Sequence, residues 1–446
     1  MKVSKWKVLG IAGALVLGYA VASDAAQIKV DDDTFADLGF WMKVRYNNFD
    51  DRADSSGNGL KTPDYSRNVF DVVDARFNIE GQINNIVQFY GEVVTSGAYS
   101  SGVYDAVGLS RGTNAKLSEG GINLVFLPEL QLRLGKIRIP FTRDQQEARY
   151  SYIVQTDWLY DPQGLFTYWK KGLLRLMDGG AVLHGELAKG MLRYDVGVFN
   201  QASDDEPLNS VAWAARVEFT PTMLGFNPET KTSGRGWLHD TYLGKKGDIL
   251  SIGLGYFTQD VYAAYQGQVT SGSGSKSFDA LTGYFTGGAL LPYDVSGTPA
   301  SNPKELDVDA WTIDAFLEKR FGCAVLNLEA AYVNWDDSHL GTNNKKEDSY
   351  YWYAKGQILY DQVVGIGKPA LYVKYDYIEA DNMYSNDDFE MTRWGLGVNY
   401  YIAGNAARLV VGMDSVSYDD GADDILDETH LEDNITDWFV QAQIMF

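Results

Sequence analysis

Six basic residues gather in one stretch of an otherwise acidic chain, and their chemistry suits the binding of anions. The whole sequence has 38 basic and 60 acidic residues, a formal charge of −22. Between residues 138 and 175 the basic residues outnumber the four acidic ones and are Arg138, Arg143, Arg149, Lys170, Lys171 and Arg175. Arginine forks match phosphate oxygens, and lysine offers a compact charge. We therefore predict an anion-contacting site; the alternative is that these residues pair with local carboxylates and hold the chain in place.

Amphipathic strands surround this stretch, and the last ten residues show the pattern most clearly. One face of the strand predicted for residues 437–446 carries Trp438, Val440, Ala442, Ile444 and Phe446. The opposite face has glutamines in its middle, so the period is two residues. About ten tilted residues cross a bilayer as a β-strand, with aromatic residues at its interfaces. The aromatic end of the strand resembles the assembly signal of bacterial outer-membrane barrels, with Trp438 and Phe446 as its residues.

Sixteen strands of this kind are predicted along the chain. They cover residues 35–49, 70–83, 87–94, 122–127, 130–139, 181–187, 191–199, 211–219, 250–257, 311–319, 324–335, 351–360, 371–377, 392–401, 407–418 and 437–446. Nearly every second connection is short, as in transmembrane barrels. Residues 220–248 break this rule and form a long connection at the short-turn end. The fold class is therefore all-β, an antiparallel transmembrane barrel. Accepting residues 277–287 as a strand would give seventeen; because such barrels have an even number of strands, a further strand would then have been missed, and eighteen is the second choice.

Charged residues occupy the polar faces of these strands. The basic ones are Arg76, Arg133, Arg193, Arg216, Lys355, Lys374, Arg393 and Arg408. The acidic ones are Asp74, Glu80, Glu92, Asp195, Glu218, Asp314, Glu318, Glu329, Asp376 and Asp414. Charges are costly in lipid or in a dry core, so a water-filled lumen is predicted, lined by these residues. The alternative is that they are mutually paired wall charges without a role in selectivity. In the strand 70–83, Asp71 and Val73 are predicted to share the outer face with Phe77.

The N-terminal residues predict export. Three lysines precede an apolar run, and Ala20-Val21-Ala22 offers a cleavage site. Residues 1–22 are therefore a predicted signal peptide and residues 23–446 the barrel. Cleavage leaves 35 basic and 60 acidic residues, a charge of −25, which excludes nucleic acid as a partner. The single cysteine, Cys323, excludes an internal disulfide.

Residues 132–143, with the sequence LRLGKIRIPFTR, resemble the phosphate- and polyphosphate-selective porin family of bacterial outer membranes. The resemblance implies a sixteen-stranded, usually trimeric barrel, with the long loop after the fifth strand folded inward as a constriction. It also implies passive diffusion of small anions such as phosphate. The mixed charge of the predicted lumen keeps two alternatives open, a general or cation-preferring pore and a barrel that sheathes a multihaem cytochrome in an electron-transfer conduit.

No residues predict catalysis or a bound cofactor. The four histidines show no metal-ligand spacing, and no nucleophile or phosphate-loop motif occurs. We therefore expect a non-enzymatic protein without metal or cofactor. Its expected partners are small hydrophilic solutes, outer-membrane lipid and lipopolysaccharide, the barrel-assembly machinery and two further copies of the chain.

Overall fold

The fold is described from a computed structural model of the chain. It describes residues 26–50, 67–95, 115–155, 159–162, 166, 177–200, 211–229, 238–263, 304–336, 348–380, 388–423, 426 and 431–446. The predictions for Lys170, Lys171, Arg175 and the segment 277–287 lie outside these residues, as do the predicted signal peptide and two of the histidines.

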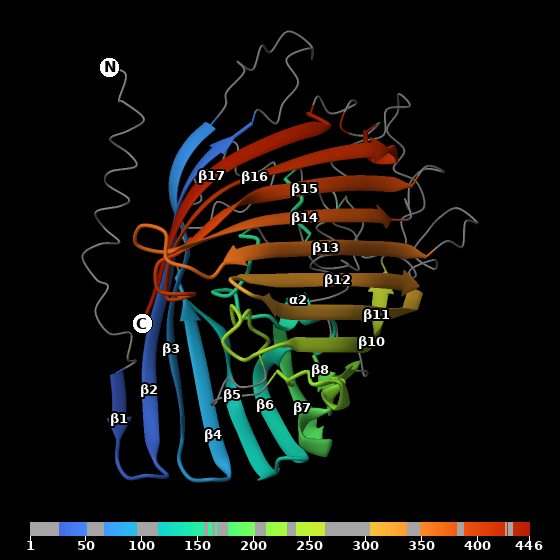
Figure 1. The fold of residues 1–446 in the computed structure, drawn as a ribbon. Helices are drawn as coiled ribbons and strands as arrows, with labels where there is room; N and C mark the ends of the chain where they lie inside the picture. The colour runs from blue at the N-terminus through green and yellow to red at the C-terminus, as the bar shows by residue number, and fades with distance from the viewer. Residues whose placement is uncertain are drawn as a thin grey trace.

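Within the described residues, seventeen strands form one antiparallel sheet that curls into a ring (Figure 1). Their bounds are β1 (Ala26–Lys29), β2 (Phe35–Phe49), β3 (Arg67–Gln82), β4 (Val87–Val94), β5 (Lys116–Leu127), β6 (Leu130–Arg138), β7 (Met177–Leu187), β8 (Leu192–Phe199), β9 (Ala212–Phe219), β10 (Ile249–Ala263), β11 (Lys304–Phe321), β12 (Ala324–Asp336), β13 (Ser349–Tyr360), β14 (Lys368–Ala380), β15 (Phe389–Tyr401), β16 (Ala407–Asp420) and β17 (Asn434–Met445). The short helical turns are α2 (Arg143–Gln146), η3 (Ala188–Gly190) and η4 (Thr222–Leu224).

Sixteen of these strands, β2 to β17, close the barrel. Each pairs with the next along the chain, and β17 pairs with β2 over Trp438↔Asn48 to Met445↔Trp41. The strand β1 is an addition that folds back on the start of β2. The last residue continues the closing ladder, because Phe446 and Phe40 exchange backbone hydrogen bonds of 2.8 and 2.9 Å. The predicted sixteen-stranded antiparallel barrel is confirmed.

The alternation of side chains decides which face is inside. On β17, Gln441 and Gln443 are fully buried inside the ring, whereas Trp438 is half exposed outside. Aromatic side chains also meet on the outer face near the long-loop ends of β11 to β15, where Tyr375 lies between Trp352 and Trp394. Such a band fits the interface of a bilayer. Among the described residues, no helix is long and apolar enough to cross a membrane.

A β-bulge in β3 changes the faces predicted for its first half. The register with β2 shifts between Lys43↔Asp74 and Val44↔Val72, which leaves Val73 as the extra residue. A bulge reverses the alternation on one side of itself. Asp71 therefore pairs with Arg45 and shares its inner face. The outward placement of Asp71 was wrong because strict alternation takes no account of an inserted residue.

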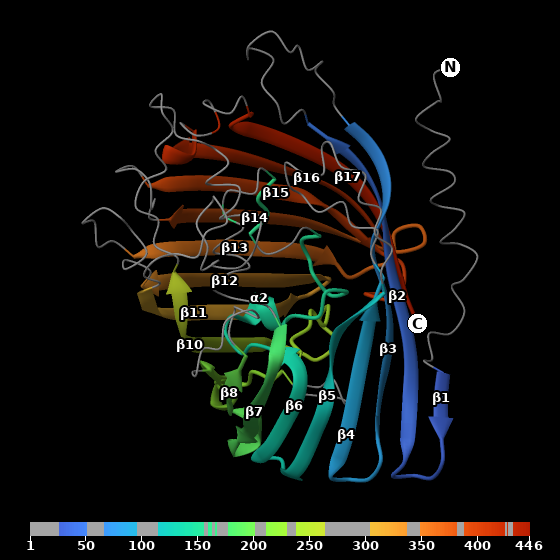
Figure 2. The same cartoon turned by 180° about the vertical axis from the view of Figure 1, so that it is seen from behind.

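The long loop after β6, which is the fifth of the predicted strands, enters the barrel, as predicted. Its first turn is α2, which Thr142 and Gln145 cap reciprocally with hydrogen bonds of 3.2 Å (Figure 1). Farther along, the carbonyl of Ile153 accepts a hydrogen bond of 2.8 Å from Asn399 on β15. The ring of Phe166 lies 6.4 Å from that of Tyr418 on β16. The loop therefore crosses from the β6–β7 side to the opposite wall; Figure 2 shows α2 inside the ring from behind.

The connection between β9 and β10 also folds into the barrel. It was predicted simply as a long connection at the short-turn end, but its described residues contact the inner wall and the long loop after β6. Backbone bonds of 2.9 and 3.0 Å join Ala148 to His239 and His239 to Gln146. The Glu318 carboxylate of β11 accepts three backbone N–H groups, from Tyr242, Leu243 and Gly244, at 3.1, 3.1 and 2.6 Å. We call residues 220–248 the inner segment; its length is explained by this return into the interior.

Candidate functional site

The long loop after β6 meets a basic wall made by β2 and β16. Lys43 on β2 donates to the carbonyl of Arg149 at 2.7 Å. Arg408 on β16 donates to the Tyr150 carbonyl and to Gln155 Oε1, both at 3.0 Å. Neither side chain has a carboxylate within ion-pair distance among the described residues, although both are buried. Since a buried charge is normally paired, the lack of a carboxylate partner distinguishes Lys43 and Arg408 from most of the other buried basic residues of the barrel.

Arg45 and Arg149 extend the same basic wall. Arg45 donates to the carbonyl of Gln155 at 2.5 Å and to Gln441 Oε1 at 2.7 Å. Arg149 is the most exposed of the four, with 24% of its side chain accessible, and lies 3.9 Å from Asp74. The positive charge of the wall therefore reaches an accessible surface at Arg149.

The other side of the loop meets an acidic network that Arg143 holds together. Its guanidinium donates to both oxygens of Glu229 at 3.0 and 3.1 Å and pairs with Glu329 on β12. It also donates to the Asp240 carbonyl at 2.9 Å and lies 3.6 Å from the ring centroid of Phe316. Arg143 is fully buried. These contacts make it the common anchor of the loop, the inner segment and the wall.

Two compact groups of three side chains belong to this network, one made of carboxylates alone and one that includes a histidine. The first comprises Asp144, Glu147 and Glu329. The ammonium group of Lys355 sits among them, paired with Asp144, 2.9 Å from Glu147 and 3.2 Å from Glu329. Burial acts to raise the pKa of Asp144, but the positive charges of Lys355, Lys374 and Arg143 outweigh it and lower that pKa.

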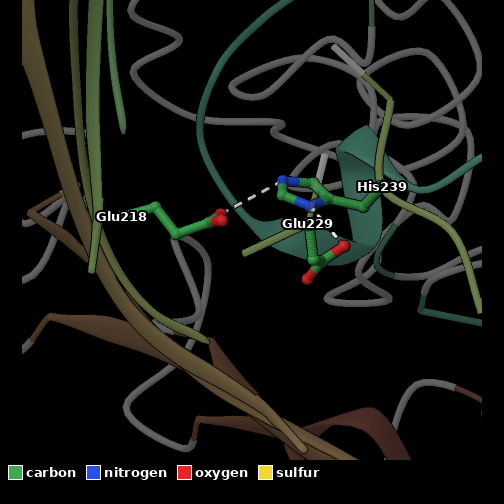
Figure 3. Close-up of side chains that lie close together, drawn as sticks. All are labelled: Glu218, Glu229 and His239. Atoms are coloured by element: carbon green, nitrogen blue, oxygen red, sulfur yellow. Dashed lines mark hydrogen bonds and ion pairs between the residues drawn. The ribbon is translucent and has the colours of Figure 1, made fainter. Parts of the chain in front are cut away.

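The second group comprises Glu218, Glu229 and His239 (Figure 3). His239 Nδ1 lies 3.0 Å from Glu229 and Nε2 lies 3.3 Å from Glu218 on β9. All three side chains are buried. Burial opposes ionisation of Glu229, but Arg143 and His239 hold its pKa below the ordinary value. Next to His239, burial and the charge of Glu147 raise the pKa of Asp240 to about 7. Among the described residues, this group therefore combines two carboxylates with a single imidazole.

All eight basic residues predicted for the lumen wall are buried inside the barrel. Seven of them have carboxylates within 4.0 Å, as in the pairs Arg76–Glu92, Arg133–Asp195, Arg193–Asp195, Arg216–Asp314, Lys355–Glu147, Lys374–Asp376 and Arg393–Asp376. The eighth is Arg408, on the basic wall. The prediction was that water solvates these charges. In the described residues seven of the eight basic side chains are ion-paired, and the inserted loop contacts Arg216, Lys355 and Arg408.

The residues predicted for the constriction have unlike surroundings. Arg138 is buried, 3.2 Å from Glu119, and donates to the carbonyls of Gln145 and Glu147 at 2.9 and 2.8 Å. It therefore holds the start of the loop, much as Arg143 holds α2. Arg149 is accessible. The assembly-signal residues Trp438 and Phe446 both lie on the outer surface.

Some residues of the site were missing from the prediction. Lys43 and Arg45 lie on the inner face of β2, where the alternation of Trp41, Lys43, Arg45 and Asn47 is visible in the sequence and could have identified them. Glu229 and His239 give no such signal, because the connection that contains them has no periodicity and its return into the barrel depends on distant partners.

The three hydrogen bonds to Glu318 give a test of the inner segment. We expect Glu318→Gln to weaken its attachment by about 1.5–3 kcal/mol, because a buried charged acceptor is lost. Trypsin should then cleave after Lys245 or Lys246 several times faster than in the wild type. Asp361→Asn is a control, since Asp361 pairs with the half-exposed Arg320 at 2.5 Å at the same end of the barrel. Equal cleavage of both variants and the wild type would show that Glu318 does not anchor the segment.

No protein-family model matches the sequence, and no curated protein sequence matches it. Several solved structures share its fold. OprB of Pseudomonas putida has a TM-score of 0.52 and 12% identity over 93% of this chain and 94% of its own. The anion-selective porin from Comamonas acidovorans has a TM-score of 0.50 and 12% identity, over 93% of this chain and 100% of its own. The outer-membrane protein OmpT of Vibrio cholerae has the same TM-score and identity, over 94% of this chain and 100% of its own. At this identity the likeness establishes the barrel fold.

Proposed function

We propose that the protein is a porin of the bacterial outer membrane, a channel through which small anions such as phosphate diffuse passively. The observation that carries this proposal is the basic wall, where Lys43 and Arg408 lack carboxylate partners among the described residues and Arg149 is accessible. Positive charge beside a narrow aqueous path favours anions and excludes cations. The outer aromatic band and the barrel fold support the membrane location.

The buried ion pairs support a division of labour among the predicted constriction residues. Arg138 and Arg143 are committed to carboxylates and backbone carbonyls, so they position the loop. Arg149 contacts the passing anion, while Lys43 and Arg408 act on it through their field. Lys170, Lys171 and Arg175 lie outside the described residues, and their part in the constriction stays a prediction, as does the homotrimer.

Reversal potentials in a planar bilayer under a KCl gradient test this function. We expect anion selectivity, with chloride current reduced when phosphate is added on one side. Arg149→Gln should lower the anion-to-cation permeability ratio roughly fivefold, since one unit charge at 4 Å in water is worth about 1 kcal/mol. Lys319→Gln, on the outward face of β11, is the matched control and should leave the ratio unchanged.

A cation-preferring pore is the second candidate, favoured by the excess of carboxylates around Arg143. A cation-selective potential without phosphate block would replace the first proposal by this one. For the cytochrome conduit we find no supporting observation, because the chain's own loop and inner segment already pass through the interior that a haem protein would enter.

A further inference from the structure

The group of Glu218, Glu229 and His239 joins the inner segment to the barrel wall (Figure 3). Glu218 comes from β9, whereas Glu229 and His239 come from two parts of the inner segment. The imidazole lies between the two carboxylates. Its Nδ1 is hydrogen-bonded to Glu229 at 3.0 Å. Its Nε2 forms no hydrogen bond within the described part of the chain, although it is buried and directed at Glu218 Oε2, 3.3 Å away.

Comparison with the neighbouring carboxylate group shows what this one lacks. Among Asp144, Glu147 and Glu329 the ammonium of Lys355 stands within ion-pair distance of all three carboxylates. No ammonium group stands among Glu218, Glu229 and His239 in the described residues. Arg143 approaches only Glu229, and Arg216 lies 3.4 Å from Glu218 while binding Asp314 at 2.5 Å. A bound cation would therefore supply to the second group the positive charge that Lys355 supplies to the first.

The charge of the connected network leads to the same conclusion. Its carboxylates are Asp144, Glu147, Glu218, Glu229, Asp314 and Glu329, and its permanent cations are Arg143, Arg216 and Lys355. Within the described residues, six carboxylates thus meet three permanent cations in this ion-paired network, and such an excess is costly in a buried region. A divalent cation would remove most of it.

We propose that Glu218 and His239 bind a divalent transition-metal ion of the zinc type, with Glu229 as the residue that orients the imidazole. A glutamate oxygen and an imidazole nitrogen are common zinc ligands. The Nδ1–H donates to Glu229, which leaves Nε2 as the nitrogen with a free lone pair, directed at Glu218. A carboxylate behind a metal-binding histidine fixes its tautomer in this way. Water completes the coordination, and the ion clips the inner segment to β9, whichever ions the barrel conducts.

Zinc binding to the whole barrel tests the proposal. The folded protein in detergent is stripped with EDTA, titrated with Zn²⁺ by calorimetry, and its bound zinc is measured by mass spectrometry after dialysis. We expect one zinc per barrel. His239→Gln should abolish binding, and Glu229→Gln should weaken it about 10–100-fold, the usual loss when the partner of a ligand is removed. His184→Gln is the control, because His184 is equally buried on β7 but bonded to Asn123 at 2.8 Å.

Titration with a second metal ion, Co²⁺, distinguishes a loss of metal binding from a loss of folding. Co²⁺ should give the wild type an absorption spectrum of nitrogen and oxygen coordination, and Glu218→Gln should change it while the barrel stays folded by circular dichroism. If His239→Gln does not fold, Glu218→Gln decides the question. Absence of saturable zinc binding in the wild type, or binding unchanged in the folded variants, overturns the proposal and leaves His239 as a structural side chain between two glutamates.

Discussion

Replacing Arg143 by methionine should lower the free energy of unfolding of the barrel by about 3–5 kcal/mol, the usual cost of removing one partner from a buried ion pair. The variant keeps an apolar stem against Phe316 but leaves Glu229 and Glu329 without their guanidinium. Urea unfolding in detergent micelles, followed by tryptophan fluorescence, measures the change. The single-channel conductance should also rise, because Arg143 joins the loop to the inner segment.

The matched control for this variant is Arg149→Met. Arg149 belongs to the same loop, but it is partly accessible and its carboxylate contact is 3.9 Å long, so its removal should cost less than about 1 kcal/mol. A double-mutant cycle of Arg143→Met with Glu229→Gln should give a coupling energy within the roughly 0.5–3 kcal/mol seen for contacting residues. Equal unfolding midpoints for Arg143→Met and Arg149→Met would contradict the anchoring role.

The barrel itself was predictable because each strand carries its own signal. A strand between lipid and a polar interior must alternate, so β2 and β4 were predicted with the bounds that the structure shows. Strand ends were harder to predict than strand centres. Residues 250–257 and 311–319 were predicted where β10 spans Ile249–Ala263 and β11 spans Lys304–Phe321. The bulge at Val73 was not predicted either, because no feature of the local sequence indicates an inserted residue.

The interior was harder to predict because its contacts join distant residues. Arg143 meets Glu229 and Glu329, which lie 86 and 186 positions farther along the chain. A sequence count of charges could show that the basic stretch was exceptional. It could not separate Arg143, which is buried among carboxylates, from Arg149, which is accessible, because that difference depends on where the inner segment lies.

Lys355→Met should make the stability of the barrel fall more steeply with rising pH than that of the wild type. In the wild type the positive charges of Lys355, Lys374 and Arg143 lower the pKa of Asp144 against the effect of burial. A lowered folded-state pKa gives stability that is present above the unfolded pKa, about 3.9, and lost as the pH falls. Without the ammonium, burial and the neighbouring carboxylates should raise the pKa of Asp144 above that value.

Between the unfolded and the raised folded pKa, the folded variant binds more protons than the unfolded chain, so its stability must fall as the pH rises. We expect a loss of about 3–5 kcal/mol at pH 8 that largely disappears near pH 5. Unfolding midpoints across this range measure the slope. Lys319→Met is the control, since Lys319 is partly exposed and lies 3.7 Å from Asp248, away from Asp144, so its profile should stay close to the wild type. A Lys355→Met profile parallel to the wild type would mean that the three carboxylates are not held together by this ammonium.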